Sequence, residues 1–190
     1  VPVPEAALVV DGTDRFLIPG LAEMHAHVPP AASDTLERDF ALFVANGVTT
    51  VRGMLGHPTH LQLREDLLEG RAFGPRLITS GPSLNGRSVN GAADGARQVR
   101  EQYAAGYDFV KIHPGLKADE FEAIARTANE LGMPFAGHVT VAVGVERAVD
   151  PRFRFENVRG GLVAETVSLR CIIEIEKLQA QARGLRRVRV

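Results

Sequence analysis

Two histidines stand one residue apart, His25 and His27, in the stretch LAEMHAH that closes an apolar run. Side chains alternate between the two faces of a strand, so both imidazoles would lie on one face. Pro29 and Pro30 follow and would end the strand, which puts both histidines at its carboxyl end. Two imidazoles so placed can reach one metal ion. The simpler alternative is a pair of polar side chains bonded to solvent or backbone.

Two more side chains suited to metal chemistry lie in later apolar segments. Lys111 stands in DFVKIH, where an amine is costly unless it is paired or modified. His138 stands in FAGHVT, near the end of another predicted strand. Taken alone, Lys111 could form an ion pair and His138 could be a satisfied core histidine. If the strands are parallel, their carboxyl ends meet at one edge, and we expect these residues to converge there with His25 and His27.

Three further residues are candidates for substrate contact. Arg52 ends a predicted strand and could bind a carboxylate through two parallel hydrogen bonds, or form an internal salt bridge. His113 shares the predicted face of Lys111 and could approach a substrate. His57 in the loop after the second predicted strand, and His60 at the start of the next predicted helix, could contact a substrate, but the sequence favours a solvated surface position for both.

The elements that would position these residues repeat along the chain. Apolar and β-branched runs predict strands over residues 21–27, 48–53, 75–81, 107–113 and 134–140. Helical periodicity predicts helices over residues 33–46, 59–69, 96–105 and 119–131. Ser33 or Asp34 would cap the first helix and Gly47 would end it. Right-handed crossovers of this length make the strands parallel, as in a doubly wound sheet or part of a (β/α)8 TIM-like barrel.

Length and composition limit the architecture and the partners. The chain has 190 residues, fewer than the ~250 of a complete barrel, and 45% of them are hydrophobic. A net charge of −1 gives no indication of nucleic acid or an anionic membrane as partner. No apolar run reaches the ~18 residues of a membrane span. The single cysteine excludes an internal disulfide, and it leaves the cellular compartment undetermined.

The repeat is not visible after residue 150. We therefore divide the chain into residues 1–20, residues 21–150 with the strand and helix repeat, and a basic, divergent tail of residues 151–190. Within that tail, residues 166–182 could form an amphipathic helix.

Five segments carry a resemblance to a known family. In order and spacing, the segments LIPGLAEMHAHVP, VANGVTTVRGMLG, GPRLITSGPSLNG, GYDFVKIHPGL and ANELGMPFAGHV resemble the metal-dependent amidohydrolase superfamily, nearest to its imidazolonepropionase-like and prolidase-like branch. The resemblance implies a partial TIM-like barrel of about five βα units over residues 21–150. Residues 1–20 then resemble a remnant of the small β-sandwich that precedes the barrel.

The same resemblance implies a metal site and a reaction. His25 and His27 match ligands of the more buried metal, Lys111 the carboxylated lysine that bridges two metals, and His138 a ligand of the second. The implied cofactor is a divalent metal, typically zinc, as one or two ions. The implied function is hydrolysis of C–N bonds in a small amide, peptide or cyclic amide by a metal-bound hydroxide.

The sequence departs from the family pattern in one respect. The family also uses a histidine after strand six and an aspartate after strand eight, but no histidine follows His138 here. The chain thus resembles a truncated or divergent member with an incomplete, weak metal site and low turnover. The alternatives are an inactive remnant or interaction protein that keeps half the barrel, and a small binding domain without metal. Open sheet edges would favour a homo-oligomer or aggregation.

Overall fold

The computed structural model describes residues 7–8 and 10–148, in which strands and helices alternate. The strands are β1 (Leu21–Ala26), β2 (Val48–Gly53), β3 (Arg76–Thr79), β4 (Val110–Ile112) and β5 (Phe135–Gly137). The helices are α1 (Leu36–Ala45), α2 (His60–Leu68), α3 (Ala92–Ala105), α4 (Ala118–Leu131) and α5 (Gly144–Ala148). All of these were predicted in approximate position except α5. The predicted tail of residues 151–190 lies outside the described residues.

All strand pairs are parallel and follow chain order. β1, β2 and β3 form one sheet, and β4 pairs with β5 in a second. Isolated parallel bridges join Ser80 to Phe109 and Leu84 to Ile112, and so connect the two sheets through residues 80–84, called here the β3–β4 junction. Within the described residues the order 1-2-3-4-5 has no reversal, so a doubly wound sheet is not supported. The predicted α/β fold with parallel strands is confirmed.

The row of strands is strongly curved. Five neighbouring strands of a flat sheet would place the outer two about 19 Å apart. His25 lies in β1 and His138 lies directly after β5. The centroids of their imidazole rings are nevertheless only 6.3 Å apart. The strand ends therefore turn toward a common centre, as in an arc of a barrel.

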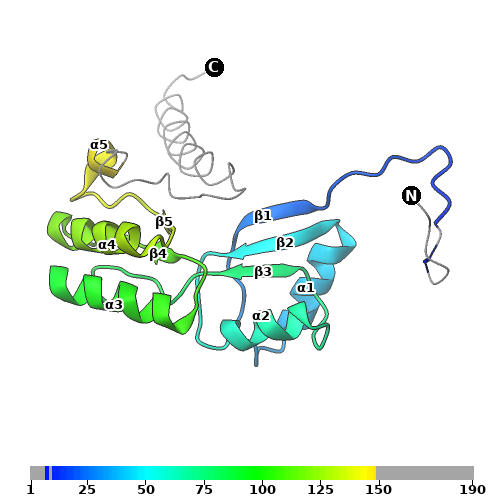
Figure 1. Ribbon diagram of the computed structural model, residues 1–190, viewed down its shortest axis with the longest axis horizontal. Helices are drawn as coiled ribbons and strands as arrows, with labels where there is room; N and C mark the ends of the chain where they lie inside the picture. Colours follow the sequence, from blue (N-terminus) through cyan, green and yellow to red (C-terminus); the bar gives the residue numbers. More distant parts are fainter. Residues whose placement is uncertain (1–6, 9, 149–190) are drawn as a thin grey trace, which may run out of the picture.

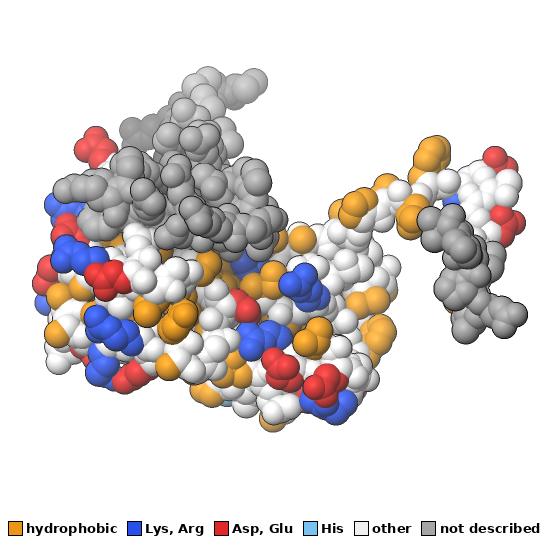
Figure 2. Space-filling model, viewed as in Figure 1, with side chains coloured by type: hydrophobic (Ala, Val, Ile, Leu, Met, Phe, Trp, Pro, Cys, Tyr) orange, Lys and Arg blue, Asp and Glu red, His pale blue; other side chains and the backbone are white. Residues whose placement is uncertain are grey.

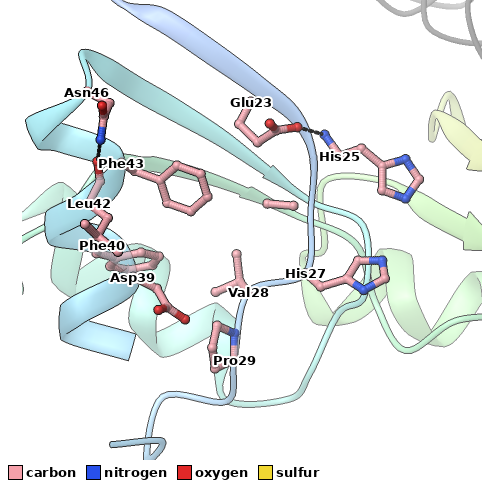
Figure 3. A pocket seen from close by; sticks show the side chains of 11 residues that line it. Glu23, His25, His27, Val28, Pro29, Asp39, Phe40, Leu42, Phe43 and Asn46 are labelled. Atoms are coloured by element: carbon pink, nitrogen blue, oxygen red, sulfur yellow. Dashed lines mark hydrogen bonds between the residues drawn. The ribbon is translucent and has the colours of Figure 1, made fainter. Parts of the chain in front are cut away.

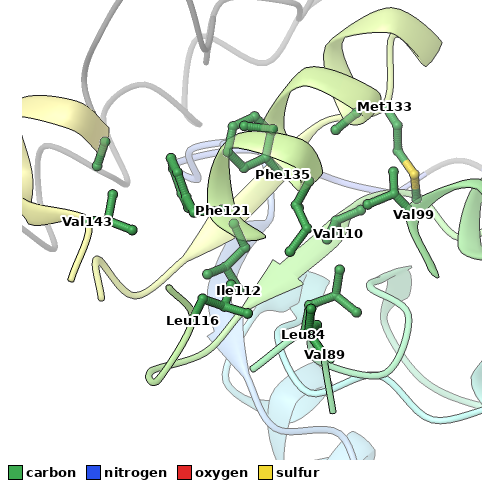
Figure 4. Close-up of a cluster of buried hydrophobic side chains, with 14 residues drawn as sticks. Leu84, Val89, Val99, Val110, Ile112, Leu116, Phe121, Met133, Phe135 and Val143 are labelled. Atoms are coloured by element: carbon green, nitrogen blue, oxygen red, sulfur yellow. The ribbon is translucent and has the colours of Figure 1, made fainter. Parts of the chain in front are cut away.

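Two apolar clusters hold the elements together. α1 and α2 lie along one side of β1–β3, while α3 and α4 stack beside β4 and β5 (Figure 1). The first cluster comprises Ala26, Val28, Leu36, Phe40, Val51, Leu63 and Leu77. The second is larger and gathers residues of α3, α4, α5, β4 and β5, among them Val99, Ile112, Phe121, Ile124 and Phe135 (Figure 4). None of the described helices has the length and apolar character needed to cross a membrane.

The beginnings of two helices differ from the prediction. Neither Ser33 nor Asp34 caps the first helix: α1 follows Thr35 without a side-chain capping bond, and the Ser33 hydroxyl bonds to the Thr35 hydroxyl at 3.0 Å. α3 begins at Ala92 and includes Gly95, which lies just before the helix predicted over residues 96–105. A Cβ on Gly95 would lie 2.9 Å from Cγ1 of Ile124, so glycine permits the close packing of α3 on α4.

The segment before β1 carries exposed apolar side chains. Phe16 and Leu17 are 96% and 101% exposed, and Ile18 is 70% exposed. The segment extends away from the body of the molecule, and its apolar side chains stand out in Figure 2. Its described residues form no strand or helix, so the predicted β-sandwich remnant in residues 1–20 stays a prediction.

β5 approaches β4 closely at Gly137. The φ angle of Gly137 is 149°, and a Cβ there would overlap the backbone carbonyl of Ile112. The next residue, His138, donates its N–H to the same carbonyl at 3.0 Å. Glycine at this position therefore sets how near His138 comes to β4.

We expect Gly137→Ala to lower the free energy of unfolding by about 2–4 kcal/mol, because it adds backbone strain and a steric overlap. Chemical denaturation followed by circular dichroism would measure the change. Gly12→Ala is the control, since no atom lies within 4 Å of a Cβ there. An equally small effect of both substitutions would contradict the close approach.

Candidate metal centre

β1 divides its side chains between two faces. Ala26 and Val28 are buried on the side of α1, whereas His25 and His27 project to the opposite side (Figure 3). The two imidazole centroids are 5.6 Å apart. The backbone N–H of His25 donates to the Glu23 carboxylate at 2.7 Å, which helps to fix the backbone before the two histidines.

Two other histidines complete a cluster with this pair. The ring of His138 lies 6.3 Å from that of His25, and the ring of His113 lies 5.0 Å from that of His138. His25, His27, His113 and His138 are called here the histidine cluster. His25 lies in β1, and the other three members lie directly after β1, β4 and β5, so the cluster gathers at the carboxyl ends of these strands.

Lys111 lies in the middle of β4 and is fully buried. Among the described residues, its Nζ has no hydrogen-bond partner. Burial, and secondarily the positive charge of Arg52, lowers the pKa of Lys111 to about 8. A larger share of this amine is thus neutral near neutral pH than for an ordinary lysine.

The surroundings also keep two histidines uncharged. Desolvation at the strand end lowers the pKa of His25 to about 4, and Lys111, His27 and His138 act in the same direction. Desolvation likewise lowers the pKa of His113, again with help from Lys111. Neutral imidazole is the form that binds metal ions.

Arg52 is almost completely buried, at 1% exposure. Its Nε donates to the carbonyl oxygen of Met24 at 2.8 Å, and its guanidinium carbon lies 5.7 Å from the centroid of the Phe109 ring. These contacts connect β1, β2 and the start of β4. The substrate contact predicted for Arg52 stays a prediction.

His57 and His60 form a separate pair, with ring centroids 5.9 Å apart. His57 is half-buried, and its Nδ1 lies 2.9 Å from the Thr59 hydroxyl. His60 is fully buried, so the expectation of a solvated position was wrong for it. It lies on the face of α2 that also carries Leu63 and Leu67, three and seven residues later, and this spacing could have predicted its burial.

Among the described residues, two cavities adjoin the histidine cluster. One of about 480 Å³ lies between β1 and α1, and His25, His27, Phe40 and Phe43 contribute to its wall. In Figure 3 the two imidazoles point away from the α1 side chains that line it. The other, of about 460 Å³, is lined by Asn85, Gly86, Arg87, His113, Pro114 and Gly115. His113 therefore borders the second cavity and also contacts the His138 ring.

The described residues contain no group of three or more His, Cys, Asp or Glu side chains arranged to hold a metal ion. The donor set predicted from the sequence depends instead on Lys111, whose ammonium form is not a ligand. A carboxylated Lys111 would add oxygen donors beside the histidines. The buried amine without a described partner fits such a modification, so the residues present are compatible with the predicted metal site.

The comparisons with known proteins agree with this geometry. A model of the amidohydrolase family matches residues 16–149. The chain therefore belongs to the amidohydrolase family. No curated protein matched the sequence.

Solved structures resemble the chain over part of their length. A bottromycin amidohydrolase is 29% identical, with a TM-score of 0.58 over 66% of this chain and 29% of its own. A candidate prolidase from Bifidobacterium longum is 22% identical, with a TM-score of 0.62 over 75% of this chain and 40% of its own. A Xaa-Pro dipeptidase with methionine bound in its active site is 22% identical, with a TM-score of 0.54 over 64% of this chain and 43% of its own. The chain thus spans less than half of these proteins.

Replacing Lys111 by methionine should stabilise the metal-free protein at pH 7 by about 2–3 kcal/mol, because a buried cation with a lowered pKa opposes folding. The pKa of Lys111 is lower in the folded than in the unfolded chain, so the unfolded chain binds more protons between about pH 8 and 10.5. Wild-type stability should therefore rise across this window more than that of Lys111→Met.

Urea denaturation at pH 7 and pH 10, in chelator and carbon-dioxide-free buffer, would measure both effects. Lys117→Met is the control, because the Lys117 side chain is 78% exposed, and we expect a change within about 0.5 kcal/mol. A Lys111→Met protein less stable than the wild type would indicate a native partner for the amine.

Proposed function

We propose that this chain acts in metal-dependent hydrolysis of C–N bonds in small amides, peptides or cyclic amides. The observation that carries the proposal is the fully buried Lys111 amine, without a described hydrogen-bond partner, beside the histidine cluster. A buried amine at that place opposes folding, and a chemical role for it would account for its retention. Membership of the amidohydrolase family and likeness to an amidohydrolase at 29% identity support the same reaction class.

His25, His27, Lys111 and His138 would hold one or two divalent ions, with zinc the expected metal. Carboxylation of Lys111 joins its neutral amine to carbon dioxide through one new N–C bond and releases one proton. The resulting carbamate carries two oxygens and a negative charge, which the neighbouring Arg52 cation favours. A bound divalent ion would polarise the scissile carbonyl and lower the pKa of a water molecule.

His113 is the substrate contact that we retain. Its ring lies against that of His138 and also lines the 460 Å³ cavity, so a substrate carbonyl or amide in this cavity could bond to it. Its lowered pKa keeps it neutral, able to donate from one ring nitrogen and accept at the other. His57 forms its ring contact with His60, outside the histidine cluster.

We further propose the domain organisation that accompanies this function. Residues 21–150 would form about five βα units of a TIM-like barrel, preceded by a β-sandwich remnant in residues 1–20 and followed by the divergent segment 151–190. The curvature of the strand row and the parallel order of its strands support the barrel. Because no histidine follows His138 in the sequence, we expect weaker metal binding and lower turnover than a complete ligand set would give.

Metal titration of the purified chain tests the proposal directly. In bicarbonate buffer, wild-type protein should bind at least one Zn²⁺ or Co²⁺ ion per chain. The double variant His25→Asn/His27→Asn should lose at least about tenfold in affinity, because two nitrogen ligands are removed. Lys117→Met, at a side chain that is 78% exposed, is the control and should bind as the wild type does. Equal binding by the double variant would contradict the assignment.

Hydrolysis assays separate the two candidate functions. N-acyl amino acids, dipeptides and cyclic amides would be incubated with the metal-loaded chain and with Lys111→Met. Slow, metal-dependent release of product that Lys111→Met abolishes supports a hydrolase. Metal binding without any turnover would favour the alternative, an inactive remnant or interaction protein that retains part of the barrel.

We also expect the chain to self-associate. Among the described residues, β1 pairs only with β2, and β5 only with β4, while exposed Phe16, Leu17 and Ile18 precede β1. Open strand edges beside apolar side chains favour pairing between copies. Sedimentation should detect dimers or larger species, and Phe16→Ser/Leu17→Ser should reduce them. A wild-type chain that stays monomeric at high concentration would contradict this expectation.

A further inference from the structure

His60, the first residue of α2, joins three separate elements although it is fully buried. Its Nε2 lies 3.0 Å from the carbonyl oxygen of Pro29, in the loop that leaves β1. Its Nδ1 lies 3.2 Å from the backbone nitrogen of His57 and 3.3 Å from the hydroxyl oxygen of Thr79, at the end of β3. A single side chain thus connects the end of β1, the start of α2 and the end of β3.

The partners of His60 determine its protonation. A carbonyl oxygen can only accept a hydrogen bond, so Nε2 must carry the proton that is donated to Pro29. A backbone N–H can only donate, so Nδ1 must be the unprotonated acceptor for His57. The two bonds together select the neutral tautomer with hydrogen on Nε2.

The neighbouring residue completes the attachment. The hydroxyl oxygen of Thr59 accepts the backbone N–H of Ala31 at 3.0 Å. Pro29 and Pro30 lack a backbone N–H, so the Pro29 carbonyl and the Ala31 amide connect this stretch to α2, while the Pro30 carbonyl accepts the local N–H of Ser33 at 2.9 Å. The bonds from His60 and Thr59 are called here the β1-exit clamp.

We infer that His60 is a positioning residue for the candidate metal centre. Pro29 lies two residues after His27, so the clamp fixes the direction in which the backbone leaves β1 and thereby the orientation of His25 and His27 toward His138. His60 itself belongs outside the histidine cluster and acts only through the backbone of Pro29. The inference rests on the proposed metal-dependent function and adds to it the residue that orients the β1 ligands.

The tautomer of His60 is the first test. Long-range ¹H–¹⁵N NMR spectra of the full metal-free chain distinguish a protonated Nε2 from a protonated Nδ1. We expect Nε2 to carry the proton near neutral pH. A protonated Nδ1, or rapid exchange between tautomers, would overturn the clamp independently of any metal or activity.

The second test compares substitutions that keep or remove the donor. Glutamine at position 60 can still offer an N–H to Pro29, whereas leucine cannot. We expect His60→Leu to reduce Co²⁺ affinity at least about tenfold, as removal of residues that orient metal ligands does elsewhere, and to speed hydrogen exchange at the Ala31 amide. His60→Gln should retain more of the affinity. Leu67→Ala, at the other end of α2, should destabilise the fold while leaving affinity unchanged.

The outcomes separate the inference from the function on which it rests. Wild-type affinity in His60→Leu would overturn the positioning role and leave the metal site intact. A loss of affinity in Leu67→Ala equal to that in His60→Leu would also overturn it, since general destabilisation would then explain the effect. If wild-type protein bound no Co²⁺, the proposed function would fail together with the positioning role, and the tautomer and Ala31 exchange would still report on the clamp.

Discussion

Parallel pairing is the constraint on which this structure depends. Each helix crosses back before the next strand begins, so successive strands run in one direction and their carboxyl ends meet at one edge. His25 and His138 are far apart in the sequence, yet the curvature of the strand row brings their rings together at that edge. A chain of antiparallel hairpins would have distributed the same residues over both edges.

The interior that forms this edge also sets its chemistry. Apolar packing around β4 removes water from Lys111 and lowers the pKa of its amine, and desolvation with nearby cations keeps His25 neutral. The burial of Lys111 weakens the fold as it stands, because burying an amine without a described partner is unfavourable. The same effects prepare the side chains for metal ligation, so stability and function oppose each other at Lys111.

The sequence predicted the strands and the shared face of His25 and His27 well, because local patterns determine them. β-branched runs, glycines after helices and alternation along β1 need no knowledge of the fold. Gly95 and His60 were misinterpreted, because their environments come from tertiary packing. Gly95 lies in α3 at a point where Ile124 of α4 leaves no room for a Cβ, and His60 can be buried because the Pro29 carbonyl and the His57 amide satisfy its ring nitrogens. A composition rule treats glycine as a loop residue and histidine as a surface residue, and it has no access to such partners.

The β3–β4 junction divides the molecule into two packing units. Pro82 stands between the two bridges and cannot donate a backbone hydrogen bond, and the pairing is irregular there. The first apolar cluster lies on one side of the junction and the second on the other. His25 and His27 belong to the first unit, whereas Lys111, His113 and His138 belong to the second. The separation of the candidate ligands therefore depends on the junction that joins the two units, where the backbone N–H of Leu84 donates to the carbonyl oxygen of Lys111 at 2.8 Å.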